Sequence, residues 1–360
     1  TLRYLFLIVI LLASGAEAYS QMNRRHIKKN NKRISSFRGK KSGFGKEKRY
    51  NAVGFSLSAL NYYGDLAPAP RRFSTDISYT RPAISLSFTH RFGPRYALTG
   101  NFMWGTLRGS DVESADPTDL TNGIFRYQRN LSFRNRITEL SVVATFDLFE
   151  NQSTYISRVR WTPYVYLGFA GFLHNPKAKA PDTDLLGQPL AEAGEWVALQ
   201  PLGTEGQYAN LPPGSSNEGI KKYHKFQPAI PFGIGARFRL NEVMDIAGEI
   251  GFRYTFTDYL DDVSRNYVDV GVFDSRLAQA MSVRGGELPD DKLQDPDPDP
   301  YPSPIDGNIY FLQPGQGRDL KNEKGETNMR GNSKDSDLHM VTTVRLTYIL
   351  GKNFHKAKFR

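Results

Sequence analysis

The chain has 360 residues, a formal net charge of +10 and no cysteine. The lack of cysteine excludes a disulfide scaffold, a Cys-ligated zinc or iron–sulfur site and a thiol nucleophile. In a soluble protein, so high a positive charge would suggest nucleic acid or another acidic partner.

Residues 1–20 have the layout of a secretory signal peptide. Arg3 precedes an apolar run from Tyr4 to Ala13, and small residues follow, including Ala16 and Ala18. These are the charged, apolar and cleavage regions of such a signal, and the run is about half of the ~20 residues that a spanning helix needs. We therefore expect the mature chain to leave the cytoplasm. Outside the cytoplasm, nucleic acid is not an expected partner.

The positive charge belongs to residues 21–50. This segment contains twelve Lys or Arg and one Glu, whereas residues 51–360 contain 34 basic and 35 acidic residues. The segment has too few apolar side chains to offset the entropy of folding, so we expect a disordered basic arm, either solvated or bound to an acidic partner. The candidate partner-binding residues are Arg24, Arg25, Lys28, Lys29, Lys32, Arg33, Lys40 and Lys41.

Eight segments within residues 51–351 alternate apolar and polar side chains. For example, Phe232, Ile234 and Phe238 alternate with Gly233 and Arg237. No run of 18 apolar residues follows the leader, and the other structure that satisfies its backbone in lipid is a closed β-barrel, whose signature is this alternation. We predict an all-β fold, an eight-stranded antiparallel transmembrane β-barrel.

The connections between the eight segments alternate in length. Three short ones lie near residues 93–94, 150–157 and 241–243, and four long ones near 63–79, 106–131, 174–225 and 260–336. Outer-membrane barrels have short periplasmic turns and long extracellular loops. We therefore expect an integral outer-membrane protein with both termini in the periplasm, including a short basic tail at 352–360.

The alternative fold is a soluble β-sandwich or a lipocalin-type barrel. Either would turn the apolar set inward and leave the charged residues of the polar set unexplained. In a membrane barrel of eight strands those charges would fill and plug the lumen. The predicted polar core of the lumen consists of Asp147, Arg237, Arg239, Glu249, Arg253 and Arg345.

Aromatic residues near the segment ends predict two interfacial girdles. One girdle would contain Tyr62, Trp104, Phe172, Tyr254 and Phe256, and the other Phe92, Tyr96, Trp161, Phe238 and Tyr348.

No catalytic or cofactor motif accompanies this pattern. His174, His224 and His339 have no Ser or acidic partner at close spacing, so a lipid-modifying enzyme is disfavoured. Asp258, Asp261 and Asp262 could ligate calcium, but no regular ligand loop follows them, and we expect a solvated turn. We expect no enzyme activity, cofactor, metal or small-molecule substrate.

The fourth long loop is acidic and rich in proline. Residues 261–336 contain fifteen acids and nine bases, and the run DPDPDPYPSP at 295–304 is expected to form neither helix nor β-ladder. The predicted outside is therefore acidic and the predicted periplasmic arm basic.

Six runs within the alternating segments and their loops carry a further signal, namely NYYGDLAP (61–68), NLSFRNRITELS (130–141), TPYVYLGFAGFLHNPKAK (162–179), LQPLGTEGQ (199–207), IPFGIGARF (230–238) and TDYLDDVS (257–264). Together they resemble the PorG-like outer-membrane β-barrel proteins of the Bacteroidetes type IX secretion system. The resemblance extends from about residue 51 to 351. The basic extension at 24–49 and the Asp-Pro run depart from the family pattern.

This resemblance implies a non-enzymatic subunit of the secretion and gliding machinery, with outer-membrane lipid around it. Its periplasmic partners would be ring proteins of the PorK and PorN type. The alternative is a surface adhesin or receptor that acts through its long loops.

Overall fold

The computed structural model describes residues 44, 48–67, 79–320, 328–333 and 336–351. The leader, the eight candidate residues of the basic arm and the tail at 352–360 lie outside the described residues. The chain divides into two units, Thr1–Gly45 and Lys46–Arg360, and the fold described below belongs to the second.

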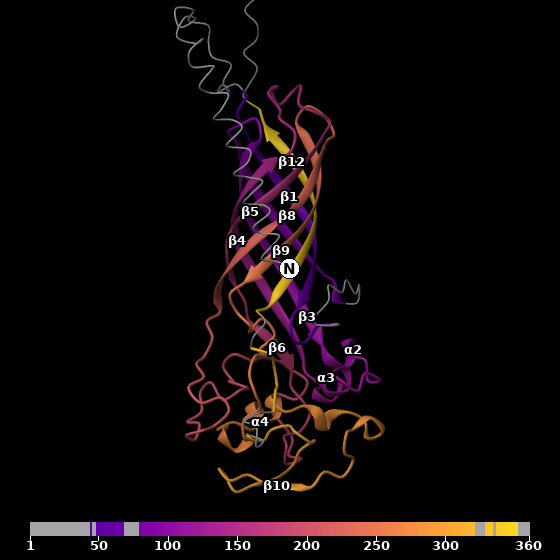
Figure 1. Cartoon of the computed structure of the whole chain (residues 1–360), viewed down its shortest axis with the longest axis vertical. Coiled ribbons are helices and arrows are strands. Elements are labelled where there is room, and N and C mark those ends of the chain that lie inside the picture. The colour runs from indigo at the N-terminus through magenta and orange to yellow at the C-terminus, as the bar shows by residue number, and fades with distance from the viewer. Residues whose placement is uncertain (1–43, 45–47, 68–78, 321–327, 334–335, 352–360) are drawn as a thin grey trace, which may run out of the picture. The chain divides into compact units, whose positions relative to one another are not determined.

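Eight long strands close into a single barrel (Figure 1). Neighbouring strands are antiparallel around the ring, and the ring closes where β12 pairs with β1, from Asn51 opposite Leu350 to Tyr63 opposite Leu338. The predicted eight-stranded antiparallel barrel is confirmed. In ring order the strands are β1 (Tyr50–Tyr63), β2 (Arg81–Arg91), β3 (Tyr96–Ser110), β4 (Ser132–Asp147), β5 (Trp161–Leu173), β8 (Phe226–Arg239), β9 (Met244–Thr255) and β12 (Leu338–Leu350).

The alternating pattern places apolar side chains on the outside of the barrel. On β5, Val165, Leu167 and Phe169 are 40%, 59% and 78% exposed, whereas Tyr164 and Tyr166, which alternate with them, are buried. A soluble barrel or sandwich would show the opposite arrangement. We call this outward-facing set the apolar belt, and its members include Val53, Phe55, Leu57, Ile84, Leu86, Phe88, Leu98, Phe102, Leu140, Val142, Val165, Leu167, Phe169, Phe232, Ile234, Ile250, Val344 and Leu346.

The two ends of the barrel differ in their connections. Residues 92–95, 148–160 and 240–243 join strands at the end where Tyr50 and Leu350 lie, which we call the turn end. Residues 64–80, 111–131, 174–225 and 256–337 join strands at the opposite loop end. The long and short connections thus alternate around the ring.

The described residues of the long loops form a loop cap with small elements of its own (Figure 1). Tyr267, Val270, Val283, Tyr310 and Leu312 are buried together in one apolar cluster of the cap. The short elements are α2 (Asp111–Ser114), α3 (Gly123–Arg129), β6 (Pro176–Lys179), β7 (Trp196–Ala198), η2 (Val270–Val272), α4 (Arg276–Ser282), η3 (Gly285–Glu287), η4 (Asp290–Lys292), β10 (Pro300–Pro302) and β11 (Ile309–Phe311).

One expectation about the Asp-Pro run is wrong. Pro300–Pro302 forms β10 and pairs with β11 in a small two-stranded sheet. Proline lacks the N–H that a central strand needs, but it is tolerated on an edge strand, and β10 has only one neighbour.

Among the described residues, no helix is long and apolar enough to cross a membrane.

The apolar belt generates a test of membrane insertion. Leu167 lies in the middle of β5, and replacing it with Arg should destabilise insertion by about 2–4 kcal/mol, because a lipid-facing charge near the bilayer midplane loses its hydration. Leu120, which is 77% exposed in the loop cap, is the matched control, and Leu120→Arg should change stability by less than about 0.5 kcal/mol. Urea titration of the barrel folded in lipid vesicles measures both, and equal effects would contradict the membrane assignment.

Candidate functional site

Ion pairs cross the lumen in the half nearer the turn end. Asp147 is 1% exposed and accepts hydrogen bonds from Arg91 at 2.6 Å and Arg237 at 2.7 Å. Glu249 accepts from Arg345 at 2.9 Å and from the Tyr164 hydroxyl at 2.6 Å. Buried charges are tolerated only when they are paired and hydrogen-bonded, and these groups satisfy one another inside the barrel.

The structure places the six predicted lumen residues as follows. Asp147, Arg237, Glu249 and Arg345 belong to the two networks just described, and Arg253 pairs with Glu139 at 3.2 Å. Arg239 forms no ion pair among the described residues. It is half-buried near the turn end and donates to the carbonyl oxygens of Asn241 and Arg158.

Two partners in the lumen were missed by the sequence prediction. Glu139 is eight positions from Asp147 on β4, so the same alternation that found Asp147 places Glu139 inside as well. Arg158 lies in the connection between β4 and β5, where no alternation exists, and it pairs with Asp245 at 2.6 Å. The inward position of Glu139 could therefore have been predicted from the sequence. The position of Arg158 could not, because it depends on how the connection folds over the barrel.

The space left between these side chains is small. A cavity of about 40 Å³ lies among the lumen residues of the turn end, lined in part by Arg91, Arg237, Glu249 and Arg345. That volume holds a few water molecules. The charged half of the lumen is therefore packed rather than open.

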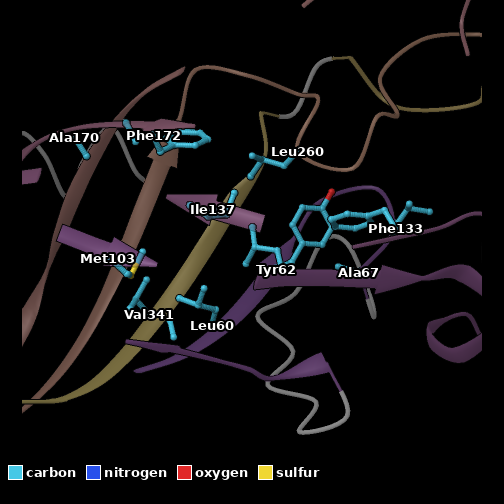
Figure 2. Packing of buried hydrophobic residues seen from close by; sticks show 14 of the residues in the cluster. Leu60, Tyr62, Ala67, Met103, Phe133, Ile137, Ala170, Phe172, Leu260 and Val341 are labelled. Atoms are coloured by element: carbon cyan, nitrogen blue, oxygen red, sulfur yellow. The ribbon is translucent and has the colours of Figure 1, made fainter. Parts of the chain in front are cut away.

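The half of the lumen nearer the loop end contains a large apolar cluster (Figure 2). Leu60, Met103, Ile137 and Val341 point inward from four strands. Leu260 from the fourth long loop joins the same buried cluster, together with Leu66 and Ala67 from the first. The prediction of a lumen filled by charges is therefore incomplete, because strands and loops also bring apolar side chains into the loop-end half, where Arg253 pairs with Glu139.

Two of the ten predicted girdle residues are also wrong. Tyr62 and Phe172 are 3% and 1% exposed and belong to this apolar cluster. On β1 and β5 the outward positions are odd-numbered, such as Phe55 and Phe169, so even-numbered residues point inward. The remaining eight are exposed by 44–56%, namely Phe92, Tyr96, Trp104, Trp161, Phe238, Tyr254, Phe256 and Tyr348.

The expected solvated aspartate turn is instead buried against the barrel mouth. Asp261 and Asp262 are 1% and 0% exposed. Asp262 accepts hydrogen bonds from Thr204 and Tyr223, both at 2.6 Å. The Asp262 carboxyl thus joins the third long loop to the fourth, and the turn helps to hold the cap together.

The Tyr62 hydroxyl lies between two carboxyl groups. Its oxygen is 2.7 Å from Asp261 Oδ2 and 2.8 Å from Asp337 Oδ1. A tyrosine hydroxyl has one proton, so it can donate to only one of these oxygens. The other carboxyl must then carry a proton of its own and donate to the tyrosine oxygen.

The burial of these acids favours their neutral forms. Desolvation, together with the charges of neighbouring acids, raises the pKa of Asp261 and Asp337 well above its usual range. Desolvation raises the pKa of Asp258 to about 9 and that of Asp262 to about 6. The protonation argument from the Tyr62 geometry and these pKa directions agree.

Two buried ion pairs hold the cap together. Arg129, at the end of α3, donates twice to Asp111 at 2.7 Å, and Arg330 pairs with Glu205 at 3.1 Å. Arg129 also donates to the Arg330 carbonyl oxygen. The second, third and fourth long loops are therefore linked by polar contacts as well as by apolar clusters.

Two of the histidines singled out in the sequence are buried in the described part of the chain. His174 and His339 are 2% and 0% exposed at the loop end of the lumen. Burial lowers the pKa of His174 to about 4, and its ring contacts Asn135 and the His224 carbonyl oxygen. Within the described ranges, no group of three or more His, Asp or Glu residues is arranged to hold a metal ion.

Comparison with known proteins finds one family and several structures. Residues 43–184, which include β1 to β5, match a family described as "Domain of unknown function (DUF6089)". No curated protein matches the chain.

Three solved barrels illustrate the structural likeness. The N-terminal β-barrel domain of Pseudomonas aeruginosa OprF is 8% identical, with a TM-score of 0.30, over 84% of this chain and 99% of that one. A major outer membrane protein from Thermus thermophilus is 11% identical, with a TM-score of 0.34, over 83% and 99%. The outer membrane protein OprG from Pseudomonas aeruginosa is 9% identical, with a TM-score of 0.32, over 86% and 99%.

The lumen networks predict a large penalty for removing a shared acid. Asp147→Asn should lower the free energy of unfolding by about 3–5 kcal/mol, because Arg91 and Arg237 would be left buried without their counter-charge. Glu150→Gln is the matched control, since Glu150 and Arg95 are 45% and 37% exposed at 3.9 Å, and such pairs contribute about 0–1 kcal/mol. Denaturant titration in detergent compares the two variants, and a small effect of Asp147→Asn would show that the network is not stabilising.

The buried acids predict a cap that loosens at alkaline pH. Between pH ~4 and ~9 the folded state keeps a proton on Asp258 that the unfolded state releases, so cap stability is full below that window and falls as pH rises through it. Amide hydrogen exchange of residues 256–320, compared at pH 6 and 9 after correction for the intrinsic rate, should show the loss of protection.

Asp258→Asn should reduce this pH dependence, because an amide cannot ionise. Asp274→Asn, at an exposed position of the same loop, should leave it unchanged. A cap equally protected at both pH values in the native protein would contradict the assignment of neutral acids.

Proposed function

We propose that this protein is a non-enzymatic outer-membrane component of the type IX secretion machinery, and of gliding in species that glide. In this role the barrel anchors a periplasmic ring of PorK- and PorN-like proteins to the outer membrane. The observation that carries the membrane part of the proposal is the apolar belt, whose exposed members lie on all eight strands of the barrel and alternate with inward-facing residues.

The filled lumen favours an anchor over a transport channel. Paired charges occupy the half of the lumen near the turn end, and the apolar cluster around Ile137 occupies the other half. A barrel of eight strands leaves little room beyond its own side chains. Substrate passage through the lumen would require both halves to rearrange.

The proposed orientation follows from the two ends of the barrel. Short turns are periplasmic in outer-membrane barrels, so the turn end would face the periplasm and the loop cap would face outward. Tyr50 starts β1 at the turn end, and the basic residues at 24–49 precede it in the chain. The proposed arm would therefore reach the side of the membrane on which the ring lies.

The resemblance of six sequence runs to PorG-like proteins supports the choice of machinery. Three of these runs fall on strands β4, β5 and β8, and the run at 257–264 forms the buried aspartate turn. These runs form barrel strands and a buried turn of the cap. A family that shares them therefore shares a fold rather than a set of catalytic residues.

A surface adhesin or receptor is the second candidate, and the organised cap favours it. The long loops pack around their own apolar clusters, and an acidic face remains exposed at Asp290, Asp291, Asp297 and Asp299. An ordered, charged outer surface of this kind suits recognition of an external partner. This candidate needs no periplasmic ring.

Affinity purification from detergent-solubilised membranes tests the main proposal. Ring proteins should be recovered with the full-length chain, and substituting Gln for the eight basic residues Arg24, Arg25, Lys28, Lys29, Lys32, Arg33, Lys40 and Lys41 should reduce recovery and its dependence on salt. Recovery of the barrel alone would overturn the ring-anchor proposal.

A cap variant separates the second candidate from the first. Replacing Asp290, Asp291, Asp297 and Asp299 with Asn changes exposed charge without touching the cap's buried ion pairs. Secretion should be unaffected if the protein is a ring anchor, whereas a surface adhesin should lose binding to its external partner.

A further inference from the structure

The outer wall of the barrel carries a group of basic residues beyond the apolar belt at the loop end. On adjacent strands, Arg108 of β3 lies opposite Arg134 of β4, and Arg134 lies opposite Lys177 of β6. Arg136 is two positions from Arg134 on β4, and Lys179 is two positions from Lys177 on β6. Each therefore lies on the same face as its neighbour, and both are exposed. We call Arg108, Arg134, Arg136, Lys177 and Lys179 the basic ladder.

The placement of like charges opposite one another needs an explanation. Directly opposed like charges destabilise a sheet, and strand pairing here puts three cations in one row. The acid that contacts the row is Glu113 of α2, which pairs with Arg108. The described contacts of Arg134, Arg136, Lys177 and Lys179 include no ion pair with an acidic side chain.

The basic ladder continues the outward face of the apolar belt toward the loop end. On β4, Leu140 and Val142 belong to the belt, Thr138 follows toward the loop end, and Arg136 and Arg134 come next on the same outward face. Trp104 pairs with Thr138 and is 47% exposed. Tryptophan favours the boundary between hydrocarbon and headgroups, so the arginines lie at the level of the headgroups.

Two aromatic rings hold arginines of the ladder against the wall. The Arg134 guanidinium carbon lies 4.0 Å from the centroid of the Trp196 ring on β7, and that of Arg136 lies 5.8 Å from the Trp104 ring. Trp196 is 41% exposed, and Lys179 lies opposite it. Stacked guanidinium groups keep their charge and their outer N–H donors available, and those donors match phosphate oxygens.

We propose that the basic ladder binds the phosphate groups of a phosphorylated glycolipid in the outer leaflet of the membrane. The acyl chains of that lipid would lie against the belt residues Leu140 and Phe169, and its headgroup phosphates would be held by Arg134, Arg136 and Lys177. This inference rests on the outer-membrane placement in the proposed function and adds a specific lipid contact on one side of the barrel. Clusters of cations beside a membrane-spanning surface attract anionic headgroups in this way.

Binding of diphosphoryl lipid A to the full-length protein in detergent micelles tests the proposal. The triple variant Arg134→Gln, Arg136→Gln, Lys177→Gln should bind about 100-fold more weakly, because the loss of each cation near a charged headgroup weakens binding about fivefold. The matched control is Lys221→Gln with Lys222→Gln, which removes two exposed charges of the third long loop outside the ladder and should leave the affinity unchanged.

Further measurements identify the source of the phosphate and test the proposal without relying on a variant that could misfold. Dephosphorylated lipid A should bind weakly, and inorganic phosphate should not compete at millimolar concentration. Native-protein binding should also weaken as salt rises, a readout independent of any variant. Equal binding of the dephosphorylated lipid, competition by inorganic phosphate, salt-independent binding, or unchanged affinity of a folded triple variant would each overturn the proposal. Outer-membrane fractionation and ring recovery are scored separately, so failure of lipid binding is distinguishable from failure of the proposed function.

Discussion

Closure of the sheet is the constraint on which the rest of this structure depends. The thirteen paired positions between β1 and β12 give the first and last strands a neighbour on both sides, so the barrel has no open edge. A backbone surrounded by hydrocarbon needs such closure, because lipid offers no hydrogen bonds to an exposed edge. Closure with eight strands also sets a narrow lumen, and that lumen must be filled by the inward side chains.

The two halves of the lumen are filled by different kinds of contact. Near the turn end, Asp147 and Glu249 are each contacted by a cation from another strand, which keeps the buried charges paired. Near the loop end, Leu260 brings the fourth long loop into the apolar cluster around Ile137. The cap is consequently an extension of the barrel core, and the Tyr62 hydroxyl, between Asp261 and Asp337, lies where cap and barrel meet.

The outer wall of the barrel, like the lumen, has regions of different chemical character. The apolar belt surrounds it, but the basic ladder occupies one side, on β3, β4 and β6. The acidic positions in the Asp-Pro region lie on the cap instead. Such asymmetry has a physical consequence in a membrane, because charge at the headgroup level can define how a barrel is rotated among its lipids.

The sequence by itself determined the eight strands of the barrel, their order along the chain and which of their faces are apolar, because alternation with a period of two residues is a local property. It also placed Asp147, Arg237, Glu249, Arg253 and Arg345 inside, since their parity on each strand is opposite to that of the belt.

Only the tertiary structure decided which charges meet, because partners such as Arg158 and Asp245 are far apart in sequence and are joined by barrel closure. It also decided whether Asp261 and Asp262 are buried or exposed. Their sequence is that of a polar turn, but burial depends on how the first, third and fourth loops pack over the barrel mouth, and a local pattern contains no information about packing between distant segments.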